Sequence, residues 1–253
     1  MSDETEVQAS LEAVLKDEIV RMYQEVADNP TGTFHFFHGL EAAELFGYAP
    51  DWLERAPASA VASFAGVGNP HERSDLQPGE TVLDLGSGAG LDAIIASWRV
   101  GAKGKVIGVD LNPSMCLKVQ ALAAETGGRM ECLVGRMEDI PVPTASVDVV
   151  ISNGVINLSF RKRRVIEEIF RVLRPGGRIS ITDIVSAKQL SQSIVNDPKL
   201  WPVELAVLSR RERCSGCSRR RASLASDPRS SRGFASARSR RRTRPKPTES
   251  RPS

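Results

Sequence analysis

The segment 81–93, TVLDLGSGAGLDA, brings together residue types that could hold a small charged ligand. An apolar run contains Asp84 and is followed by three glycines at alternate positions, Gly86, Gly88 and Gly90. Glycines let the backbone pass close beneath a ligand, and a helix that begins after them offers free N–H groups. The dinucleotide fingerprint would need a glycine where the chain has Leu91, so this loop departs from that pattern.

Two acids accompany the loop. Asp84 could compensate the ammonium group of an amino-acid head, through a water molecule. Asp110 ends the apolar run KVIGVD and lies 20 residues after Gly90, where an acid commonly accepts both hydroxyls of a ribose. A sulfonium cofactor such as S-adenosylmethionine carries both an ammonium group and a ribose. The alternative is that the glycines form only a tight turn between a strand and a helix.

The elements that must position these residues alternate along the chain. Short runs rich in β-branched residues recur at 81–85, 105–110, 130–135, 147–153 and 178–185. Helical patterns separate them at 90–100, 113–126 and 161–173, and RVLRPGG (171–177) ends the last one. This alternation predicts an α/β fold, a doubly wound, mostly parallel, Rossmann-like sheet. Combined with the loop and Asp110, it predicts S-adenosylmethionine as the cofactor.

Three regions follow from these patterns. Residues 1–77 are expected to form an N-terminal helical cap on the substrate side, with one amphipathic helix over 9–27 and two or three short helices over 39–70. Residues 78–205 are expected to form the cofactor-binding domain, with its C-terminal strands incomplete. Residues 206–253 are rich in Arg, Ser and Pro and are expected to be disordered.

Charge divides the chain in the same way. The tail from Ala206 carries 15 Lys/Arg and 3 Asp/Glu, a net +12, whereas the rest carries 19 basic and 28 acidic residues, a net −9. Such a tail could bind nucleic acid non-specifically. We favour the alternative that it derives from an out-of-frame reading of a GC-rich gene, because the change of composition falls inside an element that the fold needs.

The compartment is expected to be the cytoplasm. The acidic start MSDETEVQAS has no apolar core of a signal peptide, and no apolar run approaches the roughly 18 residues of a membrane span. The four cysteines do not form a disulfide framework.

Residues 78–185 resemble the class I S-adenosylmethionine-dependent methyltransferases. The resemblance implies that Met137 and Glu138, in VGRMEDIP (134–141), hold the adenine, and that Asn153 lies beside the methionyl part of the cofactor. Arg136 stands where members often have a carboxylate. Met137 could instead be an apolar plug at the end of a strand.

A closer resemblance extends over about 35–205. The motifs FAGVGNP, GETVLDLGSGAGLDAIIASWRVGAKGKVIGVDLNPSM, SVDVVISNGVINLS and RVLRPGGRISITDIV are similar to those of arsenite methyltransferases. That family methylates trivalent arsenic held by cysteine thiolates, a pairing of soft donor and soft acceptor. Positioning would then do most of the catalytic work.

This chain departs from the family at its cysteines. Val67 and Gly154 stand where the family usually has cysteine, and a third cysteine has no counterpart. Cys116 and Cys132 are interpreted as packing residues. Cys214 and Cys217 form a CxxC that is only half of a metal site, and His35 and His38 are more simply surface or core histidines. An altered acceptor or impaired activity is therefore expected.

The sequence thus predicts an S-adenosylmethionine-dependent methyltransferase that transfers a methyl group to trivalent arsenic or a related soft acceptor. The alternatives are a small-molecule C- or O-methyltransferase and a non-catalytic protein that binds nucleic acid through its tail. No catalytic residue, metal ligand or membrane partner is assigned, and the oligomeric state is open. The predicted cofactor-binding residues are Asp84, Gly86, Ser87, Gly88, Gly90, Asp110, Leu111, Met137, Glu138 and Asn153.

Overall fold

The computed structural model of the chain describes residues 14, 17–26, 28–29, 32 and 37–184. All of these residues belong to one compact unit. Of the helix predicted over 9–27, residues 14, 17–26 and 28 are helical. The tail predicted to be disordered lies outside the described residues, as do His35, Cys214 and Cys217.

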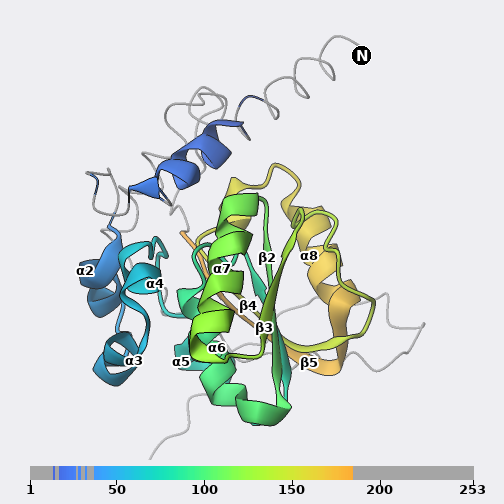
Figure 1. Cartoon of the computed structure of the whole chain (residues 1–253). Coiled ribbons are helices and arrows are strands. Elements are labelled where there is room, and N and C mark those ends of the chain that lie inside the picture. The colour runs from blue at the N-terminus through green and yellow to red at the C-terminus, as the bar shows by residue number, and fades with distance from the viewer. Residues whose placement is uncertain (1–13, 15–16, 27, 30–31, 33–36, 185–253) are drawn as a thin grey trace, which may run out of the picture. The chain divides into compact units, whose positions relative to one another are not determined.

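The core of the fold is a sheet of five parallel strands (Figure 1). The strands are β1 (Thr81–Leu85), β2 (Lys105–Asp110), β3 (Met130–Val134), β4 (Val147–Asn153) and β5 (Leu173–Thr182). Their order is β3-β2-β1-β4-β5, so the chain moves outward from β1 in one direction and then returns to its other side. This confirms the predicted doubly wound α/β fold. It also creates a switch point at the carboxyl ends of β1 and β4, where such folds bind ligands.

Helices cover both faces of the sheet. Helices α6 (Leu91–Val100) and α7 (Pro113–Thr126) lie on one face and α8 (Lys162–Val172) on the other (Figure 1). Alternate strand residues supply the two faces, because successive side chains point in opposite directions. Val82 packs in the cluster with α6 and α7, whereas Leu83 and Leu85 pack in the cluster with α8.

Local signals explain where the helices on the first face begin and end. The side chain of Asn112 accepts a hydrogen bond from the backbone N–H of Ser114, and Pro113 occupies the first turn of α7. Gly127 ends that helix in the left-handed conformation. Gly90 precedes α6. Helices α6 and α7 therefore agree with the patterns predicted over 90–100 and 113–126.

Short helices precede the sheet. They are α2 (Gly39–Leu45), α3 (Pro50–Arg55), α4 (Ala58–Ala62) and α5 (His71–Ser74). Three of them fall within 39–70, as predicted. Ala43, Tyr48 and Phe64 belong to the apolar cluster of α6 and α7, so these helices extend one face of the core. Two short 3-10 turns, η1 (Gly101–Lys103) and η2 (Ile156–Leu158), complete the described elements.

The fifth strand differs from its predicted range of 178–185. It begins at Leu173, which pairs with Val147, and the next pairing joins Arg178 to Val149. The intervening RPGG segment bulges out of register, because its proline cannot continue the helix and Gly176 adopts a positive φ of 81°. The strand ends at Thr182, and the carboxylate of Asp183 turns to accept hydrogen bonds from Asn157.

In the part of the chain that the structure describes, no helix combines the length and apolar character that a membrane crossing needs.

Candidate functional site

A cavity of about 180 Å³ opens at the carboxyl ends of β1, β2 and β4. The loop after β1, the ends of β2 and β4 and the segment after β3 all contribute to its lining. Nine of the ten predicted cofactor-binding residues line it: Gly86, Ser87, Gly88, Gly90, Asp110, Leu111, Met137, Glu138 and Asn153. The fold therefore brings together residues from four separate segments of the sequence at the switch point.

The backbone of the glycine loop adopts the left-handed conformation that glycine favours. Gly86, Gly88 and Gly90 all have positive φ values, of 75°, 51° and 93°. A Cβ atom at Gly86 would lie 2.5 Å from a methyl carbon of Val155, and one at Gly90 would lie 3.0 Å from Val119. A side chain at either position would therefore meet both backbone strain and a neighbouring element. The backbone therefore requires glycine at Gly86 and Gly90 to pass beneath the cavity.

Asp110 lies at the end of β2 and fixes the loop. Its carboxylate accepts hydrogen bonds from the backbone N–H of Gly88 and of Asn112, both at 2.8 Å. Burial raises the pKa of this carboxyl group, and the hydrogen bonds from the backbone oppose that shift. A carboxylate has about four acceptor sites. The backbone hydrogen bonds from Gly88, Asn112 and Leu111 leave some of this capacity unused, and Asp110 lines the cavity, so its carboxylate can still accept a hydrogen bond from a ligand.

Asp84 occupies a different place from its neighbours in the prediction. Its carboxylate is buried beneath the loop, where it accepts a hydrogen bond of 2.8 Å from the hydroxyl of Ser87. It is absent from the cavity lining. Burial raises the pKa of Asp84 well above its usual range, and the charge of Asp92 adds to the shift. Its compensation of an ammonium group through water stays a prediction.

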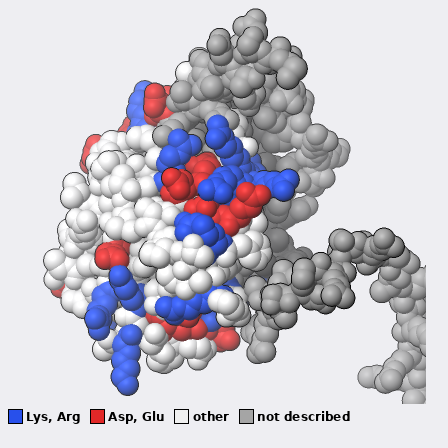
Figure 2. Space-filling model, turned by 90° about the vertical axis from the view of Figure 1, so that its right-hand side faces the viewer, with Lys and Arg blue, Asp and Glu red and all other residues white. Residues whose placement is uncertain are grey.

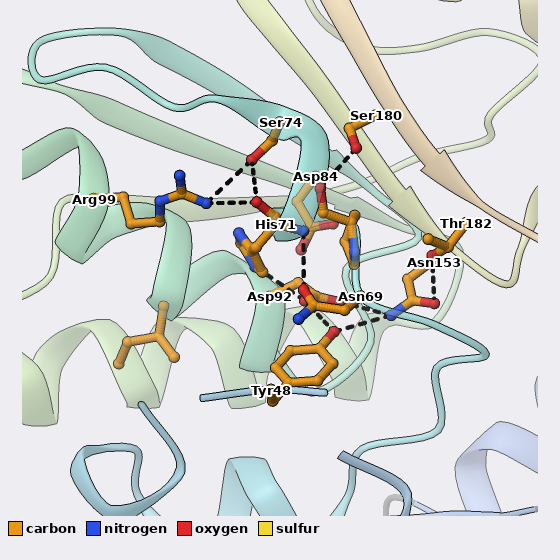
Figure 3. A network of polar contacts seen from close by, with 12 residues as sticks. Tyr48, Asn69, His71, Ser74, Asp84, Asp92, Arg99, Asn153, Ser180 and Thr182 are labelled. Carbon is orange, nitrogen blue, oxygen red and sulfur yellow. Dashed lines mark hydrogen bonds and ion pairs between the residues drawn. The ribbon is translucent and has the colours of Figure 1, made fainter. Parts of the chain in front are cut away.

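Asp92, in the first turn of α6, is the acid that sequence reasoning missed. It lines the cavity and is buried. Tyr48 donates a hydrogen bond of 2.6 Å to its Oδ1 atom, and Asn153 donates one of 3.1 Å to its Oδ2 atom (Figure 3). Burial raises the pKa of Tyr48 well above its usual value, and the charge of Asp92 adds to this. An acid immediately after the glycine loop was the only signal in the sequence.

His71 approaches the same acid from α5. Its Nε2 atom lies 3.1 Å from Oδ1 of Asp92 (Figure 3). Neither ring nitrogen has a well-aligned hydrogen-bond partner among the described residues. Trp52 and Tyr48 meet the imidazole ring edge to face. The phenol of Tyr48 and the imidazole of His71, both from the helical cap, therefore contact the carboxylate of Asp92 at the cavity wall.

Asn153 lines the cavity, but its side-chain amide forms hydrogen bonds with other residues of the protein. The Oδ1 atom accepts hydrogen bonds from the backbone N–H groups of Val67 and Gly68 and from the hydroxyl of Thr182. The Nδ2 atom donates to the carbonyl of Gly68, at 2.9 Å, as well as to Tyr48 and Asp92. Asn153 therefore holds the segment around Val67 against the end of β4.

The residues after β3 combine apolar and polar roles. Met137 packs against the apolar cluster beneath α8 and also lines the cavity, which is compatible with either of its predicted roles. The carboxylate of Glu138 accepts a hydrogen bond from the hydroxyl of Ser159 and lies 3.5 Å from Nε of Arg136. Arg136 also lines the cavity. The position where a carboxylate was expected therefore supplies a cation that pairs with its neighbour.

The two positions that lack the family's cysteines are neighbours. A Cβ atom at Gly154 would lie 3.7 Å from Cβ of Val67 and 3.1 Å from one of its methyl carbons. Gly154 has a positive φ of 76°. Among the described residues, no three His, Cys, Asp or Glu side chains are grouped as metal ligands would be. Cys116 and Cys132 are buried in the core, as expected of packing residues.

The N-terminal helix forms part of the cavity wall. Ile19, Val20 and Tyr23 contribute to the lining, and the side-chain amide of Asn112 donates a hydrogen bond of 3.0 Å to Gln24. Burial raises the pKa of Tyr23 to about 12, with smaller contributions from nearby carboxylates. The cap therefore reaches the same cavity as the sheet.

Comparisons with known proteins agree with this architecture. The model of a methyltransferase domain family matches residues 76–224. The arsenite methyltransferase of Halobacterium salinarum is 46% identical over 157 residues, which are 62% of this chain and 40% of that protein. A ubiquinone/menaquinone biosynthesis C-methyltransferase of Hydrogenovibrio crunogenus is 33% identical over 121 residues, 47% of each protein.

A solved structure resembles the chain in the same way. The crystal structure of CrArsM, an arsenic(III) S-adenosylmethionine methyltransferase from Chlamydomonas reinhardtii, superposes with a TM-score of 0.55 at 36% identity. The match covers 59% of this chain and 53% of that one. The chain thus spans only about half or less of the length of these relatives. It belongs to the methyltransferase domain family, and within it resembles the arsenite methyltransferases, class I enzymes whose methyl donor is S-adenosylmethionine.

Proposed function

We propose that this chain binds S-adenosylmethionine in the cavity at the switch point and transfers its methyl group to trivalent arsenic or a related soft acceptor. The observation that carries the proposal is the joint position of Asp110 and the glycine loop. The carboxylate of Asp110 braces Gly88 at 2.8 Å and keeps acceptor sites toward the cavity. The similarity to arsenite methyltransferases supports the choice of acceptor.

The residues present fit the cofactor. Asp110 would accept the two ribose hydroxyls, and the N–H groups at the start of α6 would face the loop side of the ligand. Met137 and Glu138 would contact the adenine. Asp92, which lines the cavity, would face the cationic end of the methionyl group, with Asp84 adding negative charge from beneath the loop. When bound, the cofactor supplies an electrophilic methyl group.

The chain's own contribution is to orient the acceptor and exclude water. Ile19, Val20 and Tyr23 of the N-terminal helix line the cavity, and we expect them to limit the access of solvent to a bound ligand. Asn153 holds the segment around Val67 beside Gly154, where the acceptor would approach. A soft acceptor attacks with its own lone pair, so the reaction needs no general base. Positioning is then the main source of rate enhancement.

The missing thiols favour a second candidate function. Val67 and Gly154 offer no sulfur to arsenic, and the methyl groups of Val67 lie against Gly154 instead. An acceptor that needs no thiolate ligand would fit this arrangement, and a C-methyltransferase of quinone biosynthesis is among the relatives. We therefore keep a small-molecule C- or O-methyltransferase as the alternative.

A nucleic-acid-binding function has less support from the described residues. Lys and Arg lie beside Asp and Glu on the face that includes α8, and much of that face is uncharged (Figure 2). Arg163 pairs with Glu167, and Arg164 pairs with Glu168. Binding through this face would first have to break such pairs, so a nucleic-acid function would depend on the basic tail.

The test is methyl transfer by the full chain from labelled S-adenosylmethionine, with arsenite and reduced glutathione as acceptor mixture. We expect slow, arsenite-dependent formation of S-adenosylhomocysteine and a labelled arsenical, both reduced in Asp110→Ala. Labelling of quinols or phenols without labelling of arsenite would favour the second candidate. No S-adenosylhomocysteine with any of these acceptors would contradict both.

A further inference from the structure

Two buried cysteines from different elements meet behind the glycine loop. Cys116 lies in the second turn of α7 and Cys132 in the middle of β3. Their sulfur atoms are 2.7 Å apart, and the residues are only 2% and 5% exposed. Neither thiol lines the cavity, so the proposed methyl transfer does not use them. The contact therefore needs an account of its own.

The surroundings leave room for these two sulfurs and little else. Cys132 pairs in register with Gly108 of β2. A Cβ atom at Gly108 would lie 3.3 Å from the sulfur of Cys132 and 2.8 Å from the hydroxyl of Ser87. A metal ion or an arsenical between the thiols would have to push these packed groups apart. A direct bond between the sulfurs adds no atom.

We propose that Cys116 and Cys132 form a disulfide when the protein meets a peroxide, and that this bond fastens α7 to β3. The sulfurs need to approach by about 0.7 Å to reach the roughly 2.04 Å of a disulfide. The two cysteines are 16 residues apart, so the bond would close a short loop. The inference rests on this contact alone and does not depend on the proposed function.

The pKa values of the two thiols are shifted in opposite directions. A hydrogen bond from Cys132 lowers the pKa of the Cys116 thiol and raises that of Cys132. We assign the first attack to Cys116: its thiol loses a proton, the sulfur bonds to one peroxide oxygen, the O–O bond breaks, and the leaving hydroxide takes up a proton to become water. The sulfur of Cys132 then attacks the sulfenic acid and loses its proton, and water leaves. In total, two thiols and one hydrogen peroxide yield one disulfide and two waters.

The bond is expected to stabilise the fold while leaving the cavity intact. It would restrain the loop between the two cysteines in the unfolded chain, and it moves the sulfurs only slightly in the folded one. For a loop of this length and a protein of this size, the melting temperature should rise by about 6–12 °C. Dithiothreitol should reverse the change.

The experiment uses the full chain with Cys214→Ser and Cys217→Ser, so that only the buried pair can react. The protein is treated with hydrogen peroxide, alkylated in denaturant and digested with trypsin. The two cysteines fall in separate tryptic peptides, 106–118 and 130–136. We expect these peptides to be joined, and to separate after reduction. The matched variant with Cys132→Ser as well should give neither the joined peptide nor the rise in melting temperature.

Two results would overturn the proposal. One is recovery of both peptides fully alkylated after peroxide treatment that oxidises an unfolded control to the joined form. The other is oxidation of Cys116 to sulfinic acid without any joined peptide. In either case the short contact would be simple core packing.

Discussion

Asn153→Asp changes one atom of the amide that holds the end of β4 to the helical cap. The Nδ2 atom of Asn153 donates to the carbonyl of Gly68, the phenol of Tyr48 and the carboxylate of Asp92, at distances of 2.9–3.1 Å. With a carboxylate oxygen in its place, the contacts with Gly68 and Asp92 would join acceptor to acceptor, and the single hydroxyl hydrogen of Tyr48 would be shared between two carboxylates. The side chain keeps its size, so the effect measures polarity alone.

The structure sets the expected magnitude. Each buried polar group that loses its partner costs about 1–3 kcal/mol, and a second carboxylate beside Asp92 adds charge repulsion. We expect Asn153→Asp to lower the free energy of unfolding by roughly 3–5 kcal/mol at pH 7.5. Thr182→Val is the matched control, because it removes the hydroxyl that donates to the same amide at 2.9 Å and contacts the carbonyl of Ser152 only at 3.4 Å. It should cost about 1 kcal/mol.

The pH dependence separates this explanation from a general loss of packing. Burial and Asp92 would raise the pKa of the new carboxyl group in the folded state. As the pH falls, the folded variant binds a proton there and regains a donor, so its deficit relative to the native chain should shrink. Urea unfolding at pH 7.5 and pH 5.5 measures both values. A loss below 1 kcal/mol, or an equal loss at the two pH values, would refute the reasoning.

Three further predictions concern the ligand. Asp110→Ala should remove charge-assisted hydrogen bonds worth about 1.5–3 kcal/mol and weaken S-adenosylhomocysteine binding roughly 10- to 150-fold; calorimetric titration measures this, and unchanged affinity would contradict the role. Because the pKa values of Asp84 and Asp110 are raised, their charges are lost at higher pH than for ordinary carboxyls. Titrations from pH 7.5 to 5 should therefore show S-adenosylmethionine, which carries the sulfonium charge, losing more affinity than S-adenosylhomocysteine; parallel losses would argue against this. Val67→Cys together with Gly154→Cys should raise arsenite binding, measured by arsenic retained after gel filtration, because the two positions are adjacent. The positive φ of Gly154 strains the second substitution, so circular dichroism first establishes that the variant is folded. Robust arsenite methylation by the unaltered chain would show that the thiolate site lies elsewhere.

Local patterns were sufficient to predict the fold and the part of the cavity formed by the glycine loop and Asp110, whereas Met137, Glu138 and Asn153 were predicted from the family resemblance. The strands at 81–85, 105–110 and 147–153 agree in both bounds, because each is a short run rich in Val, Ile or Leu that is followed by turn residues. The fifth strand was less predictable. The strand begins at Leu173, which pairs with Val147 before the irregular RPGG segment. A pairing between residues so far apart in the sequence cannot be predicted from the local pattern.

The candidate site was harder to predict where it depends on side-chain direction or on the cap. Asp84 and Val82 share one face of β1, so the side chain of Asp84 points beneath α6 and away from the cavity. The alternation of the strand contains this information. The approach of Tyr48 and His71 to Asp92 does not follow from any local pattern, because it requires the packing of α5 and its neighbours on α6.

The central claim is that the cavity holds a sulfonium cofactor through the glycine loop and Asp110. Calorimetric titration of the full chain with S-adenosylmethionine and, separately, with NAD tests it most directly. The account predicts saturable binding of S-adenosylmethionine with one site per chain, and much weaker binding of NAD, because Leu91 replaces the third glycine of the dinucleotide fingerprint. Tighter binding of NAD, or no binding of S-adenosylmethionine by the folded chain, would contradict it.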